Sequence, residues 1–244
     1  MITFIGDVHG WLDRLESILQ QEPNGAYLFL GDLIDRGPDS KAVVNKVQAL
    51  CSSGKARCII GNHEYALVRS LGCPELNIAA EPKLYDTWLN MYGGMETCLS
   101  YGVIDGDRAK LRIALGDDLV WMAKLPWIIS DQIKTPDSNW NYLAVHAGLR
   151  NEIPWQEQCN NLLDSEKCWN SQQSSTLYDC LFSKGLIHTK PFDLPDQTIV
   201  VSGHTRLNRV FTSAGRIVCD TCGGHADLPL SAIRWPSGEI YCSE

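Results

Sequence analysis

The sequence predicts an α/β fold built around a parallel sheet, and three observations support that prediction. Five short apolar runs, often β-branched, each end at or beside a polar residue that could bind a metal. Helix-like stretches separate the first three runs, and fully apolar runs of this length suit strands covered on both faces. The last third of the chain carries strand-like runs with turn residues at Pro236–Gly238, which indicates a second sheet.

The first three runs define a strand-helix-strand-helix-strand unit. They read ITFIGD at 2–7, AYLFLGD at 26–32 and RCIIGN at 57–62, where Asn62 is expected to end its strand. The stretches WLDRLESILQQ at 11–21 and DSKAVVNKVQAL at 39–50 place their apolar residues on one helical face. Such a unit forms parallel strands with right-handed crossovers, and these sheets bind ligands beyond the carboxyl ends of their strands. The polar residues at those ends therefore predict the position of a site.

Two later apolar runs share this pattern, whereas much of the segment between the first three runs and these two has a helical pattern. The later runs are YLAVHAG at 142–148 and TIVVSGH at 198–204, and both carry a histidine. Residues from about 65 to 125 look helical, with a break at Gly93 and Gly94. We expect this segment to be a helical insertion that packs over the site and shapes the substrate mouth.

Length, composition and charge limit the classes of protein that fit. The chain has 244 residues, 44% of them hydrophobic, which allows a single domain with a sizeable core. The net charge is −8 and no block of lysine and arginine occurs, so we expect neither a nucleic acid nor a membrane as partner. The start of the chain runs directly into a strand and no apolar run reaches membrane-spanning length. We therefore expect a cytoplasmic protein with free cysteines, in which the close pair Cys219 and Cys222 is packed rather than bound to zinc.

The polar residues at the strand ends form a set of metal-binding and phosphate-binding types. The set comprises Asp7, His9, Asp32, Asp35, Arg36, Asn62, His63, His146 and His204. Carboxylates, imidazoles and one amide oxygen suit Mn²⁺, Fe or Zn²⁺. Two neighbouring metal ions need a bridging carboxylate with further ligands on both sides. Asp7 and His9 can reach one ion, Asp32 can bridge, and the second ion can be completed by Asn62, His146 and His204.

Five short blocks carry a resemblance to a known family. They are GDVHG at 6–10, GDLIDRG at 31–37, GNHE at 61–64, HAGL at 146–149 and GHT at 203–205. In type and order they resemble the blocks of the calcineurin-like metallophosphoesterases. The DRG variant is similar to the phosphoprotein-phosphatase branch, with its bacterial, phage and dinucleoside-tetraphosphatase relatives. The resemblance implies one metallophosphoesterase domain over residues 1–244 and a four-layer α/β/β/α sandwich of two mixed sheets flanked by helices.

The resemblance also implies a role for each site residue. Two divalent metal ions, which we expect to be Mn²⁺ although Fe and Zn²⁺ also suit, would be bound by Asp7, His9, Asp32, Asn62, His146 and His204. His63 would be the general acid, Asp35 would orient it, and Arg36 would hold the phosphate. A water that bridges two metals loses its proton readily, so a hydroxide is expected to attack phosphorus directly. Glu64, the last residue of its block, is interpreted as structural support for the loop.

Two enzymatic functions share this chemistry. The first is hydrolysis of phosphomonoesters, namely phosphoserine, phosphothreonine and also phosphotyrosine in proteins. The alternative is hydrolysis of bis(5'-nucleosyl) tetraphosphates at the same site, so the partner is a phosphorylated protein or a small phosphorylated or nucleotide substrate. Phosphodiesterases and nucleases fit poorly, because they typically lack DRG and this chain is acidic. A binding module without catalysis is disfavoured, because every metal ligand and His63 are present.

One position departs from the family pattern. The phosphoprotein phosphatases place a second phosphate-binding arginine between the HAGL-type and GHT-type blocks, and in phage-like members it closely follows a tryptophan. Here Ser171 follows Trp169 and Asn170 instead. Arg150, Arg206 and Arg209 are the candidates to replace it. The departure concerns the identity of the substrate more than the reaction.

Overall fold

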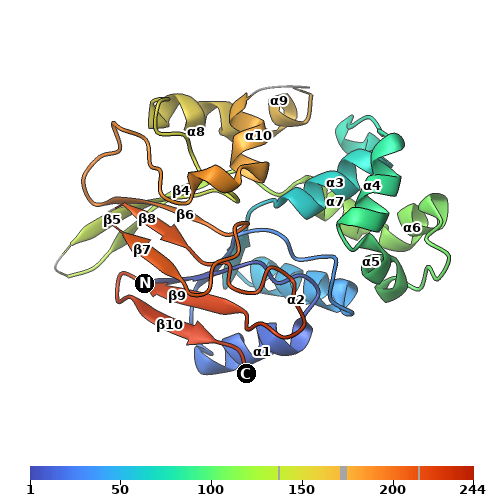
Figure 1. Cartoon of the computed structure of the whole chain (residues 1–244), viewed down its shortest axis with the longest axis horizontal. Coiled ribbons are helices and arrows are strands. Elements are labelled where there is room, and N and C mark those ends of the chain that lie inside the picture. Colours follow the sequence, from blue (N-terminus) through green and yellow to red (C-terminus); the bar gives the residue numbers. More distant parts are fainter. Residues whose placement is uncertain (137, 171–174, 214) are drawn as a thin grey trace.

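The computed structural model shows two five-stranded mixed sheets packed against each other, with helices on their outer sides (Figure 1). It describes residues 1–136, 138–170, 175–213 and 215–244. Ser171, the position of the departure noted above, lies outside the described residues. The α/β/β/α sandwich expected for the family is therefore confirmed.

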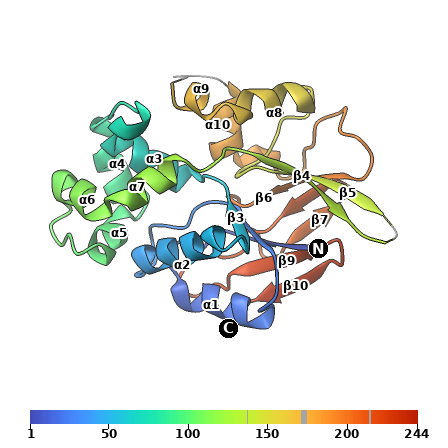
Figure 2. The same ribbon diagram turned by 180° about the vertical axis from the view of Figure 1, so that it is seen from behind.

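The first sheet contains the predicted parallel unit. Its strand order is β10-β9-β1-β2-β3, in which β1, β2 and β3 are parallel neighbours. The strands are β1 (Ile2–Ile5), β2 (Tyr27–Phe29), β3 (Ala56–Cys58), β9 (Ser231–Trp235) and β10 (Glu239–Cys242). The crossovers are α1 (Leu12–Gln21) and α2 (Ser40–Ser52), which cover one outer face as predicted. Figure 2 shows these two helices in front of the sheet.

The second sheet has the order β4-β5-β6-β8-β7, with β5, β6 and β8 parallel. Its strands are β4 (Ile129–Lys134), β5 (Asn139–Ala144), β6 (Thr198–Ser202), β7 (Phe211–Ser213) and β8 (Arg216–Val218). Three helices lie beside it, α8 (Trp155–Leu163), α9 (Ser165–Asn170) and α10 (Ser175–Phe182). The histidine-bearing runs of the sequence are thus neighbouring parallel strands, β5 and β6, as their shared pattern indicates.

Two sequence-based expectations about strands are wrong. The C-terminal hairpin β9–β10 was expected in the second sheet, but it pairs with β1 and extends the first sheet. The reason is that β1 has an open edge, whose backbone groups need partners. Asn62 was expected to end a strand, but β3 ends at Cys58 and Asn62 is the first residue of a helix capped by Gly61 and Glu64.

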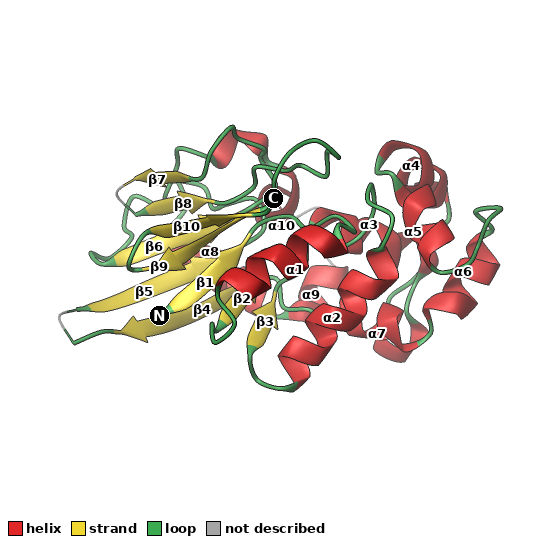
Figure 3. Cartoon of the chain, turned by 90° about the horizontal axis from the view of Figure 1, so that it is seen from below, coloured by secondary structure: helices red, strands yellow, loops and turns green. Residues whose placement is uncertain are grey.

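Residues 62–123 form a group of helices at one end of the molecule, as Figure 3 shows. Its helices are α3 (Asn62–Leu71), the 3₁₀ turn η1 (Pro74–Leu76), α4 (Lys83–Met91), α5 (Gly94–Ser100), α6 (Arg108–Leu115) and α7 (Asp117–Ala123). The predicted break at Gly93 separates α4 from α5, and Gly93 adopts a left-handed conformation there. No helix within the described part of the chain is long and apolar enough to cross a membrane.

The core lies on both faces of the sheets, because side chains alternate along each strand. Phe4 of β1 packs between the sheets, with its ring 5.3 Å from that of Tyr142 in an edge-to-face arrangement. The next residue, Ile5, belongs to the cluster that also contains Leu15 and Ile18 of α1. All ten cysteines are free thiols, as expected from the sequence.

Phe4→Ala is expected to lower the free energy of unfolding by about 3–5 kcal/mol, because it leaves a cavity between the sheets and removes the contact with Tyr142. Urea denaturation followed by circular dichroism measures the change. Ile113→Ala on α6, where the side chain is 81% exposed, is the control and should change stability by less than about 0.5 kcal/mol. A Phe4 variant as stable as this control would contradict the packed interface between the sheets.

Candidate active site

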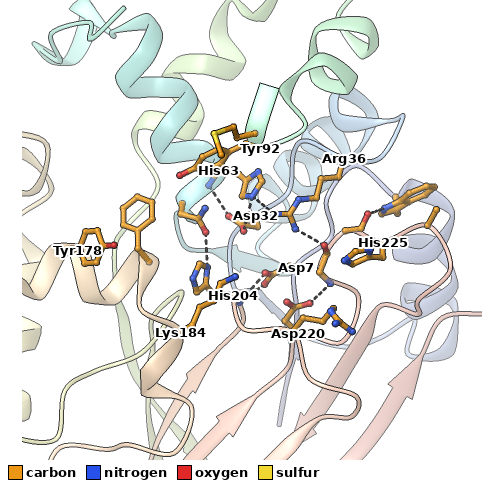
Figure 4. Close-up of a pocket in the computed structure, with 18 residues that line it drawn as sticks. Asp7, Asp32, Arg36, His63, Tyr92, Tyr178, Lys184, His204, Asp220 and His225 are labelled. Atoms are coloured by element: carbon orange, nitrogen blue, oxygen red, sulfur yellow. Dashed lines mark hydrogen bonds and ion pairs between the residues drawn. The ribbon is translucent and has the colours of Figure 1, made fainter. Parts of the chain in front are cut away.

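The polar residues of the strand ends meet at one pocket of about 820 Å³ (Figure 4). Of the nine residues singled out in the sequence, six line the pocket: Asp7, Asp32, Arg36, Asn62, His63 and His204. The other three, His9, Asp35 and His146, lie fully buried behind its wall. The expectation that these residues gather at one edge of the fold is therefore met.

Asp32 lies at the centre of the site. Its Oδ2 is 3.7 Å from Nε2 of His9, 3.8 Å from Nε2 of His63 and 3.3 Å from Nε2 of His146. Two groups of potential metal-binding atoms share this carboxylate, each with its atoms within 4.8 Å of one another. One group adds His9 and His63, and the other adds His146 and His204. A shared carboxylate between two groups is the arrangement that two neighbouring metal ions require.

The tautomers of two histidines suit metal binding. Nδ1 of His9 lies 2.9 Å from the carbonyl oxygen of Ile34, and Nδ1 of His146 lies 2.7 Å from that of Leu30. A neutral ring that donates its Nδ1–H to a carbonyl keeps a lone pair on Nε2, and metal-binding histidines are commonly held in this way, a metal ion taking the place of any proton on Nε2. Both Nε2 atoms are directed toward the carboxylate of Asp32.

The second group of metal-binding atoms, from Asp32, His146 and His204, surrounds a point that attracts positive charge. The amide oxygen of Asn62 lies 2.9 Å from Nε2 of His146 and 2.8 Å from Nδ1 of His204. The buried Nε2 of His204 has no hydrogen-bond partner among the described residues. Burial alone would lower the pKa of His146, but the charges of Asp32 and Asp7 outweigh burial and raise that pKa to about 10. Nitrogen and oxygen donors around a point that attracts a cation fit a divalent metal ion.

Asp7 lies deeper, next to an acidic residue that the sequence analysis missed. Both carboxylate oxygens of Asp7 lie 3.0 Å from the backbone N–H of His204, which donates to them. Asp220 is 1% exposed and lines the same pocket, and its Oδ2 has no partner among the described residues. Burial and the charge of Asp220 raise the pKa of Asp7 well above its usual value. Asp220 follows the apolar run of β8, so the pattern that identified Asp7 could have identified it too.

Asp35 and His63 form a buried hydrogen-bonded pair. Nδ1 of His63 lies 2.7 Å from Oδ2 of Asp35. That carboxylate also accepts hydrogen bonds from the indole N–H of Trp88 at 2.8 Å and from the hydroxyl of Thr97 at 2.6 Å. Trp88 lies on α4 and Thr97 on α5, so the helical segment supports the pair. In the sequence, neither Trp88 nor Thr97 can be told apart from residues that simply pack on the buried face of an ordinary helix.

Arg36 fills the space in front of this pair. Its Nη2 lies 3.0 Å from Nε2 of His63, and its Nη1 lies 3.1 Å from Nε2 of His9. Nη1 also donates to the carbonyl oxygen of Gly223 at 2.6 Å. Burial lowers the pKa of His63 to about 3, and the nearby charge of Arg36 acts in the same direction. The His63 ring is therefore neutral at pH 7 in this arrangement.

The backbone of the site is strained. Seven described residues other than glycine have a positive φ, and five of them belong to the site: His9, Asp32, Asp35, Arg36 and His204. Each such residue costs about 1–3 kcal/mol, and strain of this kind concentrates at functional sites. Surrounding hydrogen bonds must therefore hold these residues in place.

Glu64 provides much of this support. Its Oε1 accepts hydrogen bonds from the N–H groups of Leu33 at 2.7 Å and Ile34 at 3.4 Å. Its Oε2 accepts from those of Asp32 at 2.9 Å and Gly61 at 3.0 Å. With both oxygens occupied by backbone donors, Glu64 supports the loop, in agreement with its interpretation from the sequence.

Glu64→Gln is expected to lower the free energy of unfolding by about 1–3 kcal/mol, because the amide NH₂ cannot accept a hydrogen bond and leaves buried N–H groups without partners. Urea denaturation of the metal-free protein measures the loss. Glu157→Gln, at an exposed position of α8, is the matched control and should leave stability unchanged. Equal stability of the two variants would show that Glu64 does not hold the loop.

The chain resembles known proteins in sequence and in fold. A symmetrical bis(5'-nucleosyl)-tetraphosphatase of Ralstonia nicotianae is 43% identical over 75 residues, which cover 28% of this chain and 26% of that relative. The match thus spans about a quarter of the relative's length. The fold resembles a solved candidate diadenosine tetraphosphatase, with a TM-score of 0.58, 21% identity and coverage of 99% of this chain and 91% of the other. It also resembles a protein serine/threonine phosphatase from Saccharomyces cerevisiae, with a TM-score of 0.57, 17% identity and coverage of 100% and 79%.

The family itself is shown by a match over most of the chain. The model of the calcineurin-like phosphoesterase family matches residues 1–207, a range that contains all five blocks noted in the sequence. This protein therefore belongs to the calcineurin-like phosphoesterase family.

Proposed function

We propose that the protein is a metal-dependent phosphatase that hydrolyses phosphomonoesters, with phosphoserine and phosphothreonine in proteins, and also phosphotyrosine, as the first candidate substrates. One observation carries the proposal. Two groups of potential metal-binding atoms share Asp32, and His63, a member of the first group, lines the same pocket and is held there by the buried carboxylate of Asp35. An acid beside a metal site is the combination that phosphoester hydrolysis needs, because the leaving oxygen must be protonated while charge on phosphorus is neutralised.

In this proposal the six ligands expected from the sequence hold two divalent ions. Asp7 and His9 would hold the first ion, Asp32 would be shared, and Asn62, His146 and His204 would hold the second. In this assignment Asp7 takes the place that His63 has in the first group of metal-binding atoms, and His63 keeps its role as proton donor. When bound, the ions supply Lewis acids for the phosphate and a water nucleophile of lowered pKa. Mn²⁺ is the metal we propose, and Fe and Zn²⁺ suit the same nitrogen and oxygen donors.

Arg36 and His63 change partners when a phosphate binds. The planar fork of Arg36 matches two phosphate oxygens, so the phosphate draws the guanidinium away from Nε2 of His63. The negative charge of the phosphate then favours a protonated His63, whose Nδ1–H is held by Asp35. The proton on Nε2 passes to the leaving oxygen, and no covalent bond between enzyme and phosphate is needed.

A second candidate function is hydrolysis of bis(5'-nucleosyl) tetraphosphates. The tetraphosphatase relative named above favours it, and so does the pocket, which is larger than one phosphate needs. Aromatic side chains of Trp11, Tyr92, Tyr178 and Phe182 line this pocket and could stack on a nucleobase. In either case we propose a cytoplasmic enzyme that acts without nucleic acid or membrane partners.

His63→Asn is expected to lower kcat about 10²–10⁴-fold, because it removes the proton donor for the leaving oxygen. Two assays on chelator-stripped protein with Mn²⁺ restored measure the effect: phosphate release from a phosphoserine peptide, and cleavage of diadenosine tetraphosphate into two mononucleotides. The matched control is His188→Asn, at an exposed histidine outside the pocket, which should retain full activity.

Removal of metal by the chelator should abolish turnover of both substrates, and Mn²⁺ should restore it, because two ions are proposed to activate the attacking water. The phosphatase proposal would be abandoned if wild-type protein with Mn²⁺ cleaved neither substrate. It would also be abandoned if the chelated protein kept its activity.

A further inference from the structure

The loop after β8 forms one wall of the pocket and is held rigidly. Arg14 of α1 donates from Nη1 to the carbonyl oxygens of His225 at 2.8 Å and Leu228 at 2.6 Å. The guanidinium of Arg14 lies 4.4 Å from the ring of Trp11, whose indole N–H donates to the carbonyl oxygen of Gly224 at 3.2 Å. Three hydrogen bonds from Trp11 and Arg14 thus position a loop that is more than 200 residues away in the chain.

Two arginine side chains pack against two adjacent glycines of this loop. Gly223 and Gly224 have φ values of +52° and +72°, which glycine adopts most readily. A Cβ on Gly224 would lie 2.3 Å from Cδ of Arg36, and a Cβ on Gly223 would lie 2.8 Å from Cδ of Arg206. Arg36 and Arg206 therefore lie against neighbouring residues of the same loop. Asp220 supports this geometry by accepting a hydrogen bond from the N–H of Gly223 at 2.7 Å.

Arg206 differs from the other two arginines considered as replacements for the one missing at Ser171. Arg150 forms an ion pair with Asp179, and Arg209 lines a different pocket. Arg206 lines the pocket of Asp32 and Arg36, is exposed to solvent, and forms no ion pair within the part of the chain that the structure describes. Arg206 therefore presents a guanidinium without an ion pair to a described residue in the pocket that Arg36 also lines, where it is available for an anionic ligand.

We propose that Arg206 binds a second phosphate group of the substrate, next to the phosphate held by Arg36. The inference rests on the second candidate function above and specifies what its site recognises, namely a compound with consecutive phosphates such as a dinucleoside polyphosphate. A single phosphate at the metal site leaves Arg206 without a partner, whereas a phosphate chain can contact both arginines along the loop. Lys184, a further cation of the pocket without an ion pair to a described residue, adds to the attraction for such a chain.

The test compares Arg206→Gln with wild-type protein, both loaded with Mn²⁺, on p-nitrophenyl phosphate and on diadenosine tetraphosphate. Loss of a charge-assisted contact should lower kcat/KM for diadenosine tetraphosphate about 10-fold or more, mainly through KM. The loss for p-nitrophenyl phosphate, which has one phosphate, should be at least about 10-fold smaller. The matched control is Arg209→Gln, which should leave both reactions unchanged because this arginine lies outside the pocket.

Equal losses on the two substrates would overturn the role of Arg206, and so would a loss no larger than that of Arg209→Gln. Failure of the proposed function is distinguishable, because wild-type protein would then hydrolyse neither compound. In that case diadenosine tetraphosphate serves as a binding probe in calorimetry with the Mn²⁺-loaded protein. Weaker binding to Arg206→Gln than to Arg209→Gln would still support the second phosphate contact, and equal binding would refute it.

Discussion

The carboxylate of Glu64 accepts hydrogen bonds from four backbone N–H groups, and the geometry of the pocket depends on that interaction. Two of these donors, the N–H groups of Asp32 and Leu33, lie on either side of the α-carbon of Asp32, which has a positive φ. A third, the N–H of Gly61, lies at the start of the helix that carries Asn62 and His63. Strands β2 and β3 are parallel neighbours, so one side chain can reach the loops at both of their carboxyl ends. The strained conformation of Asp32 is thereby kept in place, and with it the central oxygen around which the histidines converge.

The site also depends on parts of the chain that carry no recognisable motif. Trp88 and Thr97 hold the carboxylate of Asp35, which orients His63, so docking of α4 and α5 and formation of the Asp35–His63 pair are coupled. Arg14 has a corresponding role at another wall, where it holds the loop against which Arg36 lies. Helices α4 and α5 and the first helix thus each support part of the pocket.

The sequence predicts the parallel unit and most of the pocket, because both follow from local patterns. Each apolar run can be recognised from a few consecutive residues. The carboxyl ends of parallel strands then meet at one edge of the sheet, whatever the details of packing. The partner of a strand is not local information, which is why the hairpin β9–β10 was assigned to the wrong sheet. Trp88 and Thr97 were missed for the same reason, since their contact with Asp35 exists only after α4 and α5 have docked. Asp220 was missed because it lies outside the five blocks, and a single aspartate after a strand is also typical of an ordinary turn.

The claim that two metal ions share Asp32 is tested most directly by anomalous X-ray diffraction from crystals grown with Mn²⁺. We predict two manganese peaks in the pocket, about 3.5–4 Å apart, with the carboxylate of Asp32 between them. Asp32→Ala crystals grown in the same way provide the reference and should lose at least one peak. A pocket without manganese in the wild-type crystal, or peaks that leave Asp32 uncoordinated, would contradict the dinuclear site.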